Sequence, residues 1–153
     1  MKMGILNMLL GRKNINDISM EELENEKIRL TVEEKNLLSK KDKIIEIAEK
    51  LLQEDAKAIS EMEKKVIKRK LIEKDNEIKD IKEKLEEISQ KISVVDAFIR
   101  LKKEEKKLIE KGLWQVISKM SMRELEDTLV KKEIKDEERS DMLKDILSIV
   151  GKR

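Results

Sequence analysis

The ten residues LLQEDAKAIS (51–60) decide the fold that this sequence predicts, because the apolar pattern changes phase inside them. Large apolar residues recur in steps of seven up to Leu51, and a second series of sevens begins at Leu71. The two series are Leu23, Leu30, Leu37, Ile44 and Leu51, then Leu71, Ile78, Leu85, Ile92 and Ile99. Such heptads are typical of coiled-coil helices. Leu51 and Leu71 are twenty residues apart, which is not a multiple of seven, so we expect a chain reversal near position 55.

The composition favours helices in the rest of the chain as well. Of its 153 residues 46% are charged, none is Pro and four are Gly. We therefore expect an all-α protein, with a long antiparallel, coiled-coil-like hairpin over residues 18–112 and two or three shorter helices over residues 113–153. Because only one Phe and one Trp are present, we expect no thick globular core, and burial mainly in seams between long helices. The dense Lys and Glu are also typical of heat-adapted proteins.

Three helix starts follow from a Ser that has a Glu three residues later, the pattern of a capping box. They are Ser19, Ser60 and Ser121. Gly112 is expected to end the second arm, and Gly151 to cap the last helix. The segment from Met120 to Val150 is expected to form two helices or one bent helix.

The second arm, expected at about residues 60–111, would be about 75 Å long, and the first arm is expected to be shorter by about a third. The apolar cluster that includes Phe98 then has to pack on the C-terminal segments or on another copy of the chain. Residues expected to make intramolecular or subunit contacts are Phe98, Trp114, Leu125, Leu129, Leu143, Ile146 and Leu147.

The residue types leave little for catalysis. His, Cys and Tyr are absent, so the usual general acids, bases and nucleophiles are missing, together with thiol and disulfide chemistry. No Gly-rich phosphate-binding motif is present, and we interpret the paired carboxylates as solvated helix faces. We expect no enzyme activity, no metal and no cofactor. No apolar run is long enough to span a bilayer, and the opening run is too short for a signal peptide, so a cytoplasmic protein is expected.

The opening peptide MKMGILNMLLGRKN (1–14) has seven apolar side chains in its first ten residues. One interpretation is an amphipathic anchor that inserts into one leaflet of a membrane, with cations at both ends placed near lipid phosphates. The inserting residues would be Ile5, Leu6, Met8, Leu9 and Leu10, and the headgroup contacts Lys2, Arg12 and Lys13. The alternative is a flexible terminus, or a helix that docks on the hairpin or on a partner.

A basic run, KKVIKRK (64–70), holds five cations and no acid. We call Lys64, Lys65, Lys68, Arg69 and Lys70 the basic collar. A solvated helix face is one interpretation. The other is a contact with lipid phosphates, with nucleic acid, or with the acidic segment 133–141 of a neighbouring chain. Nucleic-acid recognition usually adds aromatic platforms, and none is present here, so membrane or protein is favoured and no nucleic-acid partner is expected.

The order of these features resembles the ESCRT-III membrane-remodelling family. The stretch MGILNMLLG (3–11) has the place of its hydrophobic anchor, and KRKLIEK (68–74) is similar to the basic start of its second helix. The segment KMSMRELEDTLVKKEIKDEERSDMLKDILS (119–148) is similar to its Met-led acidic region. The phage-shock-protein-A group, which also has a long hairpin, is similar too.

This resemblance implies a protein that polymerises on anionic membranes, with an AAA-type ATPase as its disassembly partner. The chain departs from the family at its end. It stops at Gly151-Lys-Arg and has no Pro, so the tail motif that the ATPase reads is missing or shortened, and recruitment would need a partner. Two other hypotheses remain: a coiled-coil adaptor or scaffold that binds a protein partner without membrane activity, and a nucleic-acid-binding hairpin.

Overall fold

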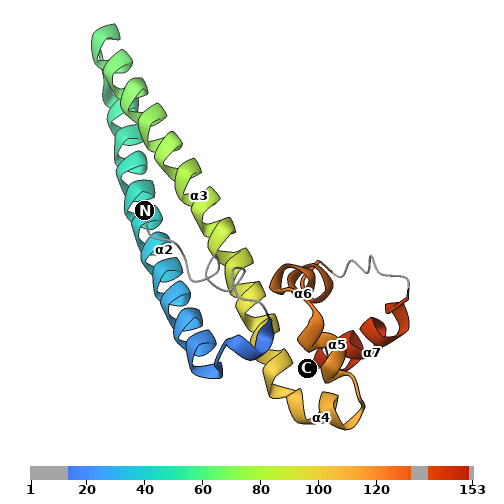
Figure 1. Cartoon of the computed structure of the whole chain (residues 1–153). Helices are drawn as coiled ribbons and strands as arrows, with labels where there is room; N and C mark the ends of the chain where they lie inside the picture. Colours follow the sequence, from blue (N-terminus) through green and yellow to red (C-terminus); the bar gives the residue numbers. More distant parts are fainter. Residues whose placement is uncertain (1–13, 132–137, 152–153) are drawn as a thin grey trace. The chain divides into compact units, whose positions relative to one another are not determined.

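The computed structural model describes residues 14–131 and 138–151, and the regular elements within these ranges are all helices (Figure 1). A short 3-10 helix, η1 (Ile15–Asp17), leads into two long helices, α2 (Met20–Lys57) and α3 (Glu61–Lys103). The shorter helices that follow are α4 (Glu105–Glu110), α5 (Trp114–Lys119), α6 (Met122–Leu129) and α7 (Ser140–Val150). The all-α class and the long hairpin followed by shorter helices are confirmed.

The hairpin reverses where the apolar phase changes. Helix α2 ends at Lys57 and α3 begins at Glu61, so the turn lies inside the stretch 51–60. The three expected capping serines are confirmed. The Oγ atoms of Ser19, Ser60 and Ser121 accept hydrogen bonds from the amides of Glu22, Glu63 and Glu124, at 3.0, 3.1 and 3.1 Å. Each bond satisfies an amide that the first turn of a helix leaves without a partner.

The chain divides into two compact units. One unit contains the described residues up to Leu30 together with those from Gln90 onward, and the other contains residues 31–89. We call them the multi-helix unit and the hairpin unit. Helices α2 and α3 contribute to both, so the units differ in what packs on the two long helices.

The hairpin unit has a seam that is only two helices wide. On α3, the less exposed positions recur in alternating steps of three and four, at 64, 67, 71, 74, 78, 81, 85 and 88. This is the a/d pattern of a coiled coil. The same alternation runs along α2 at 34, 37, 41, 44, 48, 51 and 55, and continues at position 58 just after the helix. Only Ile44, Leu51, Ile67, Ile81 and Ile88 are buried within this unit.

The multi-helix unit holds the deepest packing of the described chain. Every large side chain with less than 2% exposure belongs to it: Ile15, Ile18, Leu23, Leu30, Phe98, Leu101, Leu108, Ile117, Met122, Leu125 and Ile146. The expectation that no thick core forms is therefore wrong here. Aliphatic residues from η1, the two long helices and the shorter helices are buried together with the chain's one Phe, so a core forms.

Polar contacts tie η1 to the same unit. The ammonium of Lys102 donates to the carbonyl of Ile18, and Asn16 Nδ2 donates to Ser118 Oγ at 3.1 Å. These contacts link the start of the described chain to the end of α3 and to α5. An ion pair at 2.6 Å joins Lys27 of α2 to Asp96 of α3.

The second arm is shorter than the sequence predicts. Helix α3 has 43 residues and α2 has 38, so the expectation that the first arm is a third shorter is wrong. The difference arises at Glu104, where ψ is 8° instead of the about −42° of an α-helix. Lys, Glu and Leu around this position all favour helix. The interruption is therefore a tertiary effect that residue propensity does not predict.

Gly112 follows α4, so it ends this short helix and not the second arm, which already ends at Lys103. The φ of Gly112 is +71°, in the left-handed region that favours glycine. The amide of Gly112 donates to the carbonyl of Ile109 at 3.0 Å, and the amide of Leu113 donates to that of Leu108 at 2.9 Å. This pair of bonds is a Schellman motif. It turns the chain so that Leu108 and Leu113 are both buried.

Candidate functional site

Of the expected anchor segment 1–14, the structure describes only Asn14. Its inserting residues Ile5, Leu6, Met8, Leu9 and Leu10, and the cations Lys2, Arg12 and Lys13, lie outside the described residues. The described chain begins at Asn14, which caps η1, and both Ile15 and Ile18 are buried. The anchor therefore stays a prediction, while the segment that follows it is fixed in the multi-helix unit.

The basic collar lies within the first three turns of α3. Lys65, Lys68, Arg69 and Lys70 are exposed, and Lys64 is half-buried at a seam position. Within the described residues, no hydrogen bond or ion pair engages these five side chains. Their charge is therefore not neutralised by a carboxylate of the described chain, and an external anion can approach them.

The expected packing residues differ in depth. Phe98, Leu125, Leu129, Leu143 and Ile146 are buried in the multi-helix unit. Trp114 and Leu147 are only half-buried. Around Trp114, the buried positions are Leu113 and Ile117, which are four residues apart and so share one helix face. Trp114 lies on the adjacent face of the helix, so its side chain is at the edge of the core and only half-buried.

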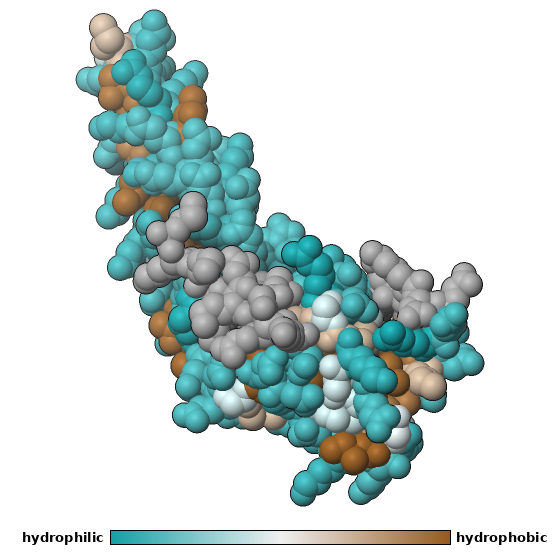
Figure 2. Space-filling view, in the orientation of Figure 1, coloured by the Kyte–Doolittle hydropathy of each residue, from teal (hydrophilic) through white to brown (hydrophobic). Residues whose placement is uncertain are grey.

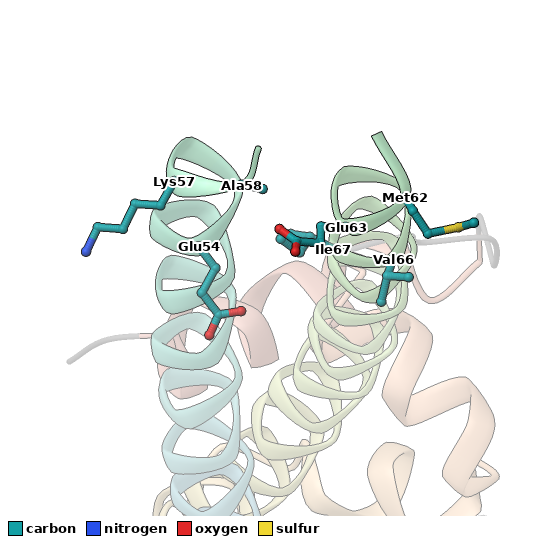
Figure 3. Close-up of a pocket in the computed structure, with 7 residues that line it drawn as sticks. All are labelled: Glu54, Lys57, Ala58, Met62, Glu63, Val66 and Ile67. Carbon is teal, nitrogen blue, oxygen red and sulfur yellow. The ribbon is translucent and has the colours of Figure 1, made fainter. Parts of the chain in front are cut away.

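An open groove at the end of the hairpin is a feature that the sequence analysis missed. It has a volume of about 500 Å³ and is lined by Glu54, Lys57, Ala58, Met62, Glu63, Val66 and Ile67. Figure 3 shows Glu54 reaching from α2 and Glu63 from α3 toward the space between the helices, while Lys57 points away. Met62 is 73% exposed and Val66 41%. The sequence does contain a feature that indicates this groove: Met62 and Val66 are apolar but lie outside the heptad positions.

An apolar line on α2 is a second surface feature of the hairpin unit. Leu38, Ile45 and Leu52 follow one another in steps of seven, beside the buried seam. Leu38 is 45% exposed, Ile45 half-buried and Leu52 57% exposed. Figure 2 shows apolar areas along the hairpin among charged surface. We call these three residues the lateral apolar line, and the described residues leave Leu38 and Leu52 about half exposed.

A second cavity, of about 490 Å³, lies in the multi-helix unit beside α7. Arg100 and Lys144 line it with Ser148, and its lining includes no carboxylate. The Nε of Arg100 is buried there without a hydrogen-bond partner. The cavity is therefore cationic, with Arg100, Lys144 and Ser148 as its polar lining.

Two further searches concern metals and membranes. Among residues 14–131 and 138–151, no group of three or more acidic, His or Cys side chains is placed to hold a metal ion. None of the helices in that part of the chain combines the length and the apolar character needed to cross a bilayer.

Comparison with known proteins gave no relative: no family model, no curated protein and no solved structure matches this chain. The functional argument therefore rests on the surfaces of the hairpin, namely the basic collar, the end groove and the lateral apolar line.

Proposed function

We propose that this chain is a membrane-associated, self-assembling helical protein of ESCRT-III type that acts in membrane remodelling or scission. The observation that carries the proposal is the basic collar. Five cations lie within seven residues of one stiff helix, and no described side chain pairs with them. An anionic lipid surface is a chemically matched partner, because it offers many phosphates without requiring a shaped pocket.

The collar and the opening peptide would act together. Each Lys or Arg close to an anionic membrane contributes about 1 kcal/mol of attraction, and a short apolar peptide alone binds weakly. Two weak contacts on one chain, repeated over many copies, bind far more tightly than either alone. The protein would therefore be cytoplasmic and attached to the membrane periphery.

Self-assembly is supported by the lateral apolar line. Leu38 and Leu52 are large, exposed apolar residues of the hairpin unit, at heptad spacing. A second hairpin laid along α2 would bury them, as a further helix does in a coiled coil. In this proposal the chain is not an enzyme, and disassembly depends on an AAA-type ATPase that a partner recruits.

The alternative is a coiled-coil adaptor, which the same apolar line favours, because a helix of another protein could cover it equally well. An adaptor of this kind does not require the basic collar to contact lipid. Membrane binding therefore separates the two candidates.

We expect the full chain to sediment with vesicles that contain phosphatidylserine and to stay in solution with purely phosphatidylcholine vesicles. Deleting residues 1–11 should reduce the bound fraction sharply, and so should Lys65→Glu, Lys68→Glu and Arg69→Glu together. Binding through the collar should weaken as salt rises from about 0.1 M to 0.5 M, because screening acts on exposed charges.

A matched control for the collar reverses three exposed lysines elsewhere in the hairpin unit: Lys43→Glu, Lys79→Glu and Lys82→Glu. This variant has the same net charge, and its binding should fall much less than that of the collar variant. Equal losses in both variants would mean that bulk charge alone determines binding. If the bound fraction does not change with the deletion, with the collar substitutions or with salt, the coiled-coil adaptor would be the better description.

A further inference from the structure

We propose that the groove at the end of the hairpin receives the opening peptide (1–13) of a second copy of this chain. The groove is formed within one unit, by the last turns of α2 and the first turns of α3 (Figure 3). The inference deepens the proposed function, and it rests on that proposal in assuming that the chain assembles with itself. A peptide that lies in a neighbour's groove is not inserted in lipid, so in such a copy the basic collar makes the membrane contact.

The lining of the groove sets the chemistry of its occupant. Ala58, Met62, Val66 and Ile67 offer apolar surface, and the carboxylates of Glu54 and Glu63 approach it from opposite helices. In the described part of the chain neither carboxylate takes part in an ion pair. A matching occupant has large apolar side chains for the surface and cations for the two carboxylates.

The chain itself contains one undescribed stretch with that chemistry. Three stretches lie outside the described residues: 1–13, 132–137 and 152–153. The second is mostly charged and the third is Lys-Arg, whereas the first has an apolar run from Ile5 to Leu10 with Lys2 before it and Arg12-Lys13 after it. The opening peptide therefore complements the groove in both charge and hydrophobicity.

The occupant has to come from another copy, because the chain's own peptide is too short. Glu54 lies 34 residues beyond Met20 on the continuous helix α2, which is about 51 Å at 1.5 Å per residue. Leu10 precedes Met20 by ten residues, and ten residues fully extended reach about 35 Å. Only the start of the run, near Ile5, would reach that far at full extension, so the apolar run as a whole cannot lie in its own chain's groove.

The geometry of this contact favours open-ended growth. Each copy has one opening peptide and one groove, so every copy can give its peptide to one neighbour and receive the peptide of another. Such a heterologous contact forms a ring or a filament according to the rotation between copies. The lateral apolar line would then join such rows side by side.

Disulfide trapping tests the inference directly, because the chain has no Cys. A full chain with Leu6→Cys is mixed with a size-tagged full chain with Val66→Cys and oxidised with copper phenanthroline. The matched control replaces Val66→Cys by Ile72→Cys, which is on the same helix, 63% exposed and outside the groove. We expect about tenfold more mixed dimer for position 66, the ratio that a docking preference of about 1.4 kcal/mol gives.

Adding Glu54→Lys and Glu63→Lys to the Val66→Cys chain should lower the yield to the level of the Ile72→Cys control. Both glutamates are exposed, so the fold is expected to persist, and far-UV circular dichroism checks this. Glu73→Lys with Glu86→Lys makes the same charge change on exposed positions of α3 and should leave the yield high. Equal yields at positions 66 and 72, or a high yield despite the lysines in the groove, would overturn the inference.

The two proposals fail in different ways. The Glu54→Lys, Glu63→Lys chain keeps the opening peptide and the basic collar, so it should still sediment with phosphatidylserine vesicles. If no disulfide is trapped but the chain still binds vesicles, only the proposed groove contact is refuted. If position 66 is trapped but the chain does not bind vesicles, the membrane function is refuted and the contact between copies is supported.

Discussion

Replacing Phe98 with alanine is expected to lower the free energy of unfolding of the multi-helix unit by about 3–5 kcal/mol, the usual cost of deleting a fully buried aromatic ring. Phe98 is the only Phe of the chain and has 0% exposure. It lies on the part of α3 where Val94, Val95 and Leu101 are also buried. The lost ring would leave a cavity that rigid neighbouring helices fill only in part.

Hydrogen exchange followed by mass spectrometry is the suitable measurement, because two compact units need not unfold in one step. Protection should fall in α5, α6 and α7, and much less between residues 37 and 85. Ile72→Ala is the control: it is on the same helix and 63% exposed, so its expected effect is about 0.5 kcal/mol or less. A Phe98→Ala chain that keeps native protection in α5–α7 would contradict the core described above.

Leu38→Asp together with Leu52→Asp is expected to raise the protein concentration needed for self-association by tenfold or more. Burying a Leu side chain contributes about 1.5–3 kcal/mol, and about 1.4 kcal/mol corresponds to a factor of ten in association. Both side chains are about half exposed in the single chain, so the substitutions should affect folding far less than association. Sedimentation velocity over a concentration series measures the shift.

The control for this variant is Ile28→Asp with Val32→Asp. Both positions are on α2 and more than half exposed, at 63% and 53%, but they lie outside the lateral apolar line. Their association should stay close to that of the native chain. If both double variants associate like the native chain, the lateral apolar line is not a contact between copies.

The hairpin could be predicted from sequence because its signals are local and periodic. The sevens ending at Leu51 and starting at Leu71 place the turn, and the serines at 19, 60 and 121 place three helix starts. Each of these signals needs only its neighbours in the chain. The helix end at Gly112 is a signal of the same kind. A positive φ is a backbone conformation that glycine adopts more readily than other residues, so the residue type alone indicates it.

The remaining features depend on tertiary packing. The interruption at Glu104 lies in a run of good helix formers, so no local signal marks it. The core around Phe98 gathers residues from Ile15 to Ile146, which no periodicity connects. The groove at Glu54 and Glu63 lies where α2 ends and α3 begins, so two helices line it. The sequence shows only that Met62 and Val66 lie outside the heptad positions.

Electron microscopy of the full chain with vesicles tests the central proposal, self-assembly on anionic membranes, most directly. With phosphatidylserine vesicles at high protein concentration, the account predicts filaments or a regular coat on the lipid, and bare surfaces on purely phosphatidylcholine vesicles. Small discrete oligomers that leave both kinds of vesicle bare would contradict it.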